Sequence, residues 1–225
     1  MADSGVENPK ALVEQGYNTV ADKYLAWVTK MPSTTQMEHV AEVLKKLPAG
    51  ADVLELGCGA GVPVTKLLIE HGLKVTGNDI SAAQISLARQ HIPTATLVHG
   101  DMLDLDFAPE SFDAVLGFYS IFHLPKGEQG KMIEKIRGWL QPGGYLLCNF
   151  HVDEGDVTRA GWFEPSVTMF SSGLGVEGTR DIFRKEVPGF EMVVDEVAVQ
   201  KVGQFEEKFH WVMAVKDTGA KGVQR

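Results

Sequence analysis

The sequence predicts an α/β domain in which a parallel sheet is covered by helices on both faces. Strand-like and helix-like segments alternate over residues 52–150, which is typical of parallel strands joined by helical crossovers. Three glycines at alternate positions in 57–61 join the first strand to a helix. Two long β runs, 190–201 and 206–215, have too few residues between them for a crossover helix. These two runs must therefore pair antiparallel as a hairpin.

Composition and charge narrow the class of partner. The chain has 225 residues, enough for one domain with a large core. Its formal net charge is −9; an acidic surface repels phosphate backbones, so we expect no nucleic-acid partner. No apolar run approaches the roughly 20 residues of a membrane span, and the polar N-terminal residues resemble no targeting signal, so we expect no membrane partner. Cys58 and Cys148 suit neither a metal site nor a disulfide framework, which predicts reduced thiols and a cytoplasmic location.

The first 50 residues predict two helices. The first, 9–30, opens at a proline, a favoured first-turn residue, and repeats apolar side chains at helical spacing. Gly16 weakens this helix, which leaves a kink or two shorter helices open. The second helix begins after a cap at Ser33 or Thr34 and ends before the break at 48–50.

The alternating region provides five strands and the helices between them. The predicted strands are 52–56, 73–78, 94–99, 112–118 and 145–150, and the helices are about 62–71, 81–91 and a segment ending near residue 140. Ser81 and Gln84 have the spacing of a capping box. Beyond the last strand, glycines and aromatic residues over 151–178 predict a loop-rich cap, followed by a helix near 179–186.

The glycine turn predicts a ligand site. Without a Cβ, glycine lets the main chain approach a ligand closely, and the start of the following helix directs free N–H groups toward it. The pattern is Gly-x-Gly-x-Gly, which differs from the Gly-x-Gly-x-x-Gly of dinucleotide-binding proteins. In open parallel sheets, ligands bind beyond the carboxyl ends of the strands. Further polar residues of the site are therefore expected at the strand ends.

Two acids at strand ends fit a nucleoside. Asp79 ends the second strand, where a carboxylate accepts from ribose hydroxyls; the alternative is an acid at the start of the next helix. Asp101 follows the third strand and can accept from a purine amine, with Ile80 and Met102 as apolar walls; the alternative is a turn-forming Asp. Glu55, just before the glycines, suits a cationic group better than a pyrophosphate. Together they predict a nucleoside that carries a cation.

At this point the sequence resembles a known family. Its motifs are similar, in order and spacing, to those of class I S-adenosylmethionine-dependent methyltransferases: Glu55–Gly61, Asp79, Gly100–Met102, Phe112–Val115 and Leu140–Gly144. The resemblance implies a Rossmann-like three-layer sandwich. Its sheet would have seven mostly parallel strands, with one antiparallel strand from the C-terminal hairpin.

The resemblance also implies S-adenosyl-L-methionine as cofactor. The expected cofactor-binding residues are Tyr17, Tyr24, Glu55, Gly57, Cys58, Gly59, Gly61, Asp79, Ile80, Asp101, Met102 and Phe118. The glycine turn would lie under the methionine moiety, Asp79 on the ribose and Asp101 on the adenine amine. Tyr17 and Tyr24 would close over the cofactor from the N-terminal helix; the alternative is a core-facing aromatic stripe.

The sequence predicts a single domain made of five segments. Its parts are an N-terminal helical lid (9–47), a cofactor-binding core (50–150), a substrate cap (151–178), a helix and β-hairpin (179–216) and a frayed tail (217–225).

The catalytic candidates follow the fourth and fifth strands. His123 is the preferred base, because the pKa of imidazole lies near working pH; the alternative is a loop histidine bonded to the backbone. Tyr119 is expected to line the pocket or to donate to the substrate, and His151 to add a second polar contact. Trp162 and Phe163 in the cap suggest an apolar or aromatic substrate, although core packing is the commoner fate of such residues.

The expected function is methyl transfer to O, N or S of a small molecule by a monomer or homodimer without a metal ion. The Asn/Asp-Pro-Pro-Tyr run of nucleobase and glutamine methyltransferases is absent after the fourth strand, where the residues are Gly117–Ser120. Three alternatives stay open: a cofactor-bound enzyme that catalyses a rearrangement or cyclisation, a non-catalytic subunit that keeps the fold, and protein methylation.

Overall fold

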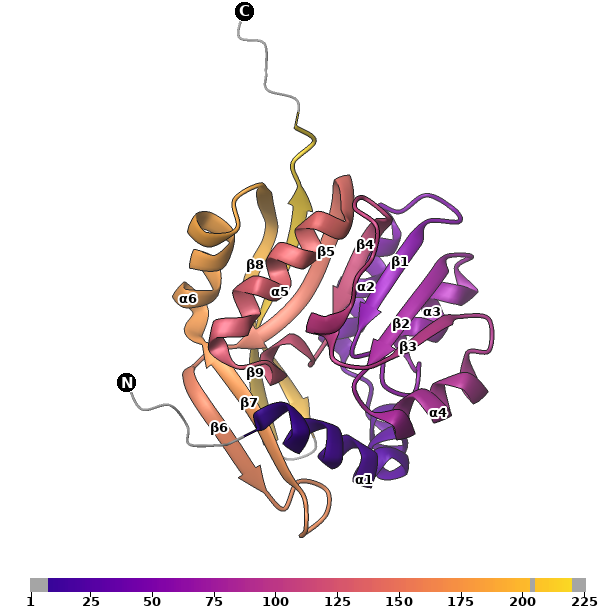
Figure 1. Cartoon of the computed structure of the whole chain (residues 1–225), viewed down its shortest axis with the longest axis vertical. Coiled ribbons are helices and arrows are strands. Elements are labelled where there is room, and N and C mark those ends of the chain that lie inside the picture. Colours follow the sequence, from indigo (N-terminus) through magenta and orange to yellow (C-terminus); the bar gives the residue numbers. More distant parts are fainter. Residues whose placement is uncertain (1–7, 203–204, 220–225) are drawn as a thin grey trace, which may run out of the picture.

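The computed structural model describes residues 8–202 and 205–219, and a seven-stranded sheet forms its centre (Figure 1). The strand order is β3-β2-β1-β4-β5-β9-β8. The strands are β1 (Asp52–Leu56), β2 (Lys74–Asp79), β3 (Thr96–His99), β4 (Phe112–Gly117), β5 (Leu140–His151), β8 (Phe190–Val202) and β9 (Phe205–Lys216). Strand β9 runs antiparallel to both of its neighbours, and all other pairs are parallel. This confirms the predicted sheet and its single reversed strand.

Helices cover both faces of the sheet. They are α2 (Thr34–Leu44), α3 (Val64–Glu70), α4 (Ala82–His91), α5 (Lys126–Trp139) and α6 (Gly175–Asp181), the last continued by a π-helical segment, η3 (Ile182–Glu186). Leu54 and Leu56 of β1 pack in one core with α5 and η3, whereas Val53 packs in a second core with α2 and α3. Alternate residues of a strand face opposite sides, so a strand buried on both faces has a nearly continuous apolar sequence. The predicted three layers are confirmed.

Helix α1 (Pro9–Lys30) lies outside these layers and crosses the lower end of the sheet in Figure 1. Asn8 caps it by accepting from the Ala11 N–H. It is one continuous helix of 22 residues, so the alternative of two shorter helices is wrong. A Cβ at Gly16 would lie 2.8 Å from Cε of Met169. Gly16 therefore allows the segment that contains Met169 to pack closely against α1.

That segment belongs to a hairpin which the sequence analysis predicted wrongly. Residues 151–178 contain two antiparallel strands, β6 (Glu154–Ala160) and β7 (Thr168–Leu174), where a loop-rich cap was expected. Most side chains of β6 are exposed, so this strand has no alternation of apolar and polar residues to reveal it. Strand β7 packs against α1 and contributes buried Met169 and Phe170.

The observed boundaries of several elements differ from the predicted ones. Strand β3 begins two residues later than predicted, β5 extends over Leu140–His151, and the helix expected near 179–186 begins at Gly175. Two short 3₁₀ helices, η1 (Met102–Asp104) and η2 (Ile121–His123), follow β3 and β4. The expected turn at 203–204 and most of the expected tail lie outside the described residues. In the described ranges, no helix is long and apolar enough to cross a bilayer.

Candidate active site

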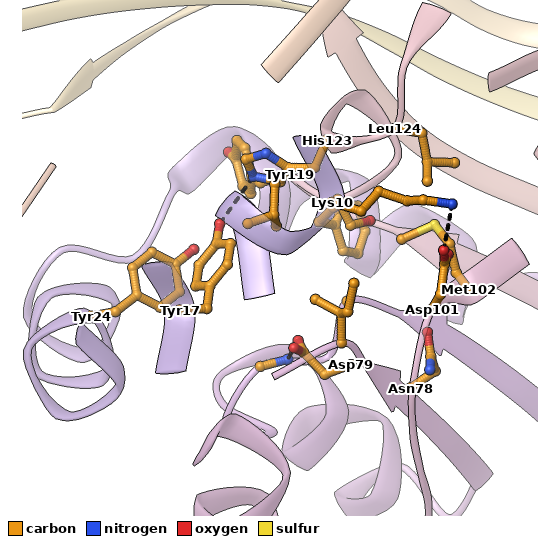
Figure 2. Close-up of a pocket in the computed structure, with 16 residues that line it drawn as sticks. Lys10, Tyr17, Tyr24, Asn78, Asp79, Asp101, Met102, Tyr119, His123 and Leu124 are labelled. Atoms are coloured by element: carbon orange, nitrogen blue, oxygen red, sulfur yellow. Dashed lines mark hydrogen bonds and ion pairs between the residues drawn. The ribbon is translucent and has the colours of Figure 1, made fainter. Parts of the chain in front are cut away.

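A cavity lies at the carboxyl ends of β1, β2 and β4, on the side where α1 crosses, and it encloses about 610 Å³ when the open solvent at its mouth is included. Figure 2 shows residues that line it. Most of the predicted site residues line it: Tyr17, Tyr24, Gly57, Gly59, Asp79, Ile80, Asp101, Met102, Phe118, Tyr119 and His123. The predicted residues Glu55, Cys58, Gly61 and His151 do not line it. Lys10, Val13, Asn78, Ser120 and Leu124 line it without having been predicted.

The glycine turn brings the backbone to the cavity. Gly57 and Gly59 have φ of 72° and 55°, in the left-handed region that favours glycine. A Cβ on Gly57 would lie 2.4 Å from Cβ of Ser120. Gly61 also has a positive φ, but a Cβ there would meet Ile92 at 2.5 Å, so this glycine serves packing against the end of α4.

Asp79 is buried at the end of β2 and is held by two backbone groups. Its Oδ2 accepts from the Gly59 N–H at 2.9 Å, and its Oδ1 accepts from the Ser81 N–H at 2.8 Å. Burial raises the pKa of this carboxyl to about 6. Each carboxylate oxygen has a second lone pair, so the ionised group can still accept from a ligand.

Asp101 is paired with a lysine of α1. Lys10 Nζ lies 2.6 Å from Oδ2 of Asp101 (Figure 2). The same nitrogen lies 3.2 Å from Oε2 of Glu128. The other carboxylate oxygen of Asp101 accepts from the Leu103 N–H. No local pattern signals Lys10, because its partners lie 91 and 118 residues further along the chain.

Glu55 does not reach the cavity. It is buried, and its Oε2 accepts from the Thr65 hydroxyl at 2.5 Å. Burial raises the pKa of the Glu55 carboxyl to about 8, so the group is mostly protonated at neutral pH. Glu55 alternates with Leu54 and Leu56, which places its side chain on the α3 face of the sheet. Glu55 therefore lies behind the cavity wall, and its contact with a cationic ligand stays a prediction.

Cys58 is equally remote from the cavity. Its thiol is buried, and Sγ lies 2.9 Å from the position that a Cβ on Gly77 would occupy. Burial also raises the pKa of the thiol. The side chain of Cys58 thus packs against β2, and its contact with the cofactor stays a prediction.

Two polar atoms at the cavity have no hydrogen-bond partner in the described part of the chain. They are Oδ1 of Asn78 and Oγ of Ser120, both buried. The amide of Asn78 donates to the carbonyls of Val98 and Gly100, so only its oxygen is free. Buried polar groups are nearly always paired, and these two atoms are available to a polar ligand.

His123 joins three elements. Its Nε2 lies 3.1 Å from the Tyr17 hydroxyl in α1 (Figure 2). Its Nδ1 lies 2.5 Å from the carbonyl oxygen of Phe170 in β7. A carbonyl can only accept, so Nδ1 carries the proton and Nε2 accepts from Tyr17. Burial lowers the pKa of His123 to about 4. In this arrangement the predicted base is a neutral imidazole with both nitrogens engaged.

Tyr119 and His151 differ in their relation to the cavity. Tyr119 lines it with a φ of 51°, and its hydroxyl donates to Oε1 of Gln200 at 2.9 Å. His151 lies between aromatic rings instead, 4.3 Å from Phe122 and 5.8 Å from Phe209 by ring centroids. His151 does not line the cavity, and its polar contact with a substrate stays a prediction.

The aromatic residues of the expected substrate cap pack against α1. Trp162 and Phe163, between β6 and β7, lie 5.6 and 5.9 Å from Tyr24 by ring centroids. Trp162 also contacts Tyr17 at 5.1 Å. Neither Trp162 nor Phe163 lines the cavity, so core packing accounts for them.

The arrangement can hold a small molecule with several polar groups. It combines two carboxylates at strand ends, backbone close to the glycine turn, and neutral hydroxyl donors with apolar walls. Among residues 8–202 and 205–219, no group of three or more His, Cys, Asp or Glu side chains is placed to hold a metal ion.

Comparison with known proteins identifies the family of this domain. The family model described as a methyltransferase domain matches residues 53–144. A sterol methyltransferase-like protein of Botryococcus braunii is 32% identical over 155 residues, which cover 60% of this chain and 39% of that protein. The chain thus spans about two fifths of the length of that relative. An uncharacterized methyltransferase of Oceanobacillus iheyensis is 26% identical over 162 residues, covering 71% of this chain and 67% of that protein.

The fold is similar to that of solved methyltransferase structures. The 1,6-didemethyltoxoflavin-N1-methyltransferase of Burkholderia thailandensis, solved with 1,6-didemethyltoxoflavin and S-adenosylhomocysteine, superposes with a TM-score of 0.71. The two are 18% identical, and the match covers 96% of this chain and 93% of that one. An identity this low establishes the fold alone. Residues 53–144 thus match a methyltransferase domain, and the sheet that contains them has the fold of S-adenosylmethionine-dependent methyltransferases.

Proposed function

We propose that this chain transfers a methyl group from S-adenosylmethionine to O, N or S of a small, apolar or aromatic molecule. The observation that carries the proposal is the cavity at the carboxyl ends of the strands, which combines the glycine turn with the Asp79 and Asp101 carboxylates. The unpaired oxygens of Asn78 and Ser120 support a polar ligand in the same cavity.

The residues present fit the cofactor. Asp79 would accept from the ribose hydroxyls and Asp101 from the adenine amine, with Ile80 and Met102 against the base. The backbone at Gly57 would lie under the methionine moiety. When bound, the cofactor supplies a methyl group activated by a sulfonium charge.

The other lining residues would exclude water and orient the acceptor. Tyr17 covers the cavity from α1, and its hydroxyl is held by His123. His123 would accept a proton from an acceptor only after that hydroxyl leaves Nε2. We therefore assign His123 first to holding α1 and β7 together, and proton transfer to it requires movement of Tyr17.

An apolar acceptor is supported by the walls of the cavity. Val13 and Leu124, which are not among the residues expected to bind the cofactor, contribute side chains without polar atoms. The relative from Botryococcus braunii is named as sterol methyltransferase-like, and a sterol is such a molecule. The net charge of −9 argues against nucleic acid as the acceptor.

A labelled-transfer experiment tests the proposal. The chain would be incubated with S-adenosylmethionine labelled in its methyl group and a panel of small apolar alcohols, amines and thiols together with metabolite extracts, and products identified by mass spectrometry. We expect at least one product that carries the labelled methyl group, and we expect Asp79→Ala to abolish it. Products without the added methyl mass, or equal labelling by the Asp79→Ala variant, would overturn the proposal.

A further inference from the structure

Asn18 links the N-terminal helix to the opposite wall of the cofactor cavity. It follows Tyr17 in α1, but its side chain contacts the start of α4 and does not line the cavity. Asn18 Oδ1 accepts from the Ser81 hydroxyl at 2.8 Å and from the Ala83 N–H at 3.1 Å. Successive residues of a helix face different directions, so α1 holds His123 through Tyr17 and α4 through Asn18.

The contact with Asn18 determines which hydrogen bonds the Ser81 hydroxyl donates and accepts. Ser81 is fully buried and caps α4: its Oγ accepts from the Gln84 N–H at 3.2 Å. The hydroxyl proton goes to Asn18, which leaves an oxygen lone pair directed at Gln84. The side chain of Gln84 has no partner in the described part of the chain, so only half of the predicted capping box forms. An acceptor from α1 completes the cap instead.

Ser81 in turn orients Asp79. Its backbone N–H donates to Oδ1 of Asp79 at 2.8 Å, while the other carboxylate oxygen is held by Gly59. The carboxylate is thus fixed between the glycine turn and the first residues of α4. A shift of Ser81 would rotate Asp79 relative to the glycine turn.

We infer that Asn18 is a positioning residue for the cofactor, which orients the Asp79 carboxylate through Ser81 when α1 is docked. The inference rests on the proposed function, in which Asp79 binds the ribose. Coupling between two events is reciprocal. A ligand that requires the Asp79 geometry therefore also stabilises the docked position of α1.

Binding of S-adenosylhomocysteine, measured by calorimetry, tests the inference without a known acceptor. Asn18→Ala removes the oxygen that accepts both hydrogen bonds, and we expect about tenfold weaker binding, or about 1.4 kcal/mol. Asn18→Asp keeps an acceptor at that position, and we expect affinity within about twofold of the wild type. Thr19→Ala is the matched control, because the Thr19 hydroxyl donates to the Gln15 carbonyl within α1.

Hydrogen exchange separates positioning from a purely structural role. In the wild type, we expect S-adenosylhomocysteine to slow exchange of the amides in α1, and in Asn18→Ala we expect that protection to be largely lost. If Asn18→Ala does not fold, Asn18→Ser serves in its place, since its shorter side chain cannot reach both donors.

The outcomes of these experiments are distinct. If the wild type fails to bind S-adenosylhomocysteine, the proposed function fails. If the wild type binds and Asn18→Ala binds equally well with full protection of α1, only the inference about Asn18 is wrong. If Asn18→Asp binds as weakly as Asn18→Ala, the acceptor role is wrong.

Discussion

On the carboxylate side of the cavity, Asp79 and Asp101 each accept from a backbone N–H two residues further along the chain. On the cap side, His123 contacts Tyr17, 106 residues earlier, and Phe170, 47 residues later. The first geometry follows from short segments at the ends of parallel strands. The second exists only after α1, η2 and β7 have packed together. The two sides should therefore respond differently to substitution.

The largest expected effect concerns the glycine turn. Gly57→Ala would force a Cβ into a left-handed backbone and against Ser120 at 2.4 Å. We expect the free energy of unfolding to fall by about 3 kcal/mol or more. Gly50→Ala is the matched control, because φ is 76° and no atom lies within 4 Å of the added Cβ. We therefore expect only the cost of placing alanine in a left-handed backbone conformation, about 1 kcal/mol. Equal losses in urea unfolding would contradict this account of the turn.

The buried Glu55 should produce the next largest effect, as a dependence of stability on pH. Its pKa is about 8 in the folded chain and about 4.3 when unfolded, so the folded state binds the extra proton between these values. The resulting stabilisation is complete below about pH 4 and is lost as the pH rises through 8.

Between pH 5.5 and 7.5, Glu55 alone should lower the free energy of unfolding by about 2 to 3 kcal/mol. Asp79 acts in the same direction up to its pKa of about 6. We expect Glu55→Gln to remove the contribution of Glu55, measured by urea unfolding of the ligand-free chain at both pH values. The same loss in Glu55→Gln as in the wild type would show that Glu55 is ionised in the folded state.

These contrasts explain which features the sequence could predict. The strands, the reversed β9 and the positions of Asp79 and Asp101 depend on local patterns: alternation, glycines and strand ends. Lys10 at Asp101 and the Tyr17 contact of His123 depend on where α1 docks, and no local pattern reports that. The contact of Glu55 with Thr65 was not predicted, because it depends on which face of β1 Glu55 occupies.

The hairpin β6–β7 shows the same limit in the fold. Its exposed strand β6 has no apolar alternation, and Gly16 fits Met169 of β7 only in the packed structure. Trp162 and Phe163 have the composition of a substrate-binding surface, yet they pack against Tyr24. Residue type alone does not distinguish these two uses.

On the cap side, His123→Ala should cost about 2 kcal/mol of stability, because two hydrogen bonds and the packing of a partly buried ring are lost. We expect faster hydrogen exchange in α1 and β7 and little change around Gly57. His71→Ala is the control, since the His71 ring contacts the Leu67 carbonyl within its own helical segment. Unchanged exchange in α1, with lower turnover and normal affinity for S-adenosylhomocysteine, would favour the base role over the packing role.

The smallest effect is expected at the outer end of α1. Lys23 forms an ion pair with Glu164, and the side chains are 57% and 32% exposed. Exposed pairs contribute little, so Lys23→Ala should change the free energy of unfolding by less than about 0.5 kcal/mol. A loss above about 1 kcal/mol in thermal or urea unfolding would mean that this ion pair, rather than the aromatic contacts, holds α1 to the hairpin.

The central claim is that the carboxylate side of the cavity binds the adenosine part of the cofactor. Calorimetric titration of the wild-type chain and Asp79→Ala with S-adenosylhomocysteine tests it most directly. We predict saturable one-to-one binding in the micromolar range for the wild type, and at least about a hundredfold weaker binding for Asp79→Ala. No binding by the wild type, or equal binding by the variant, would contradict the claim.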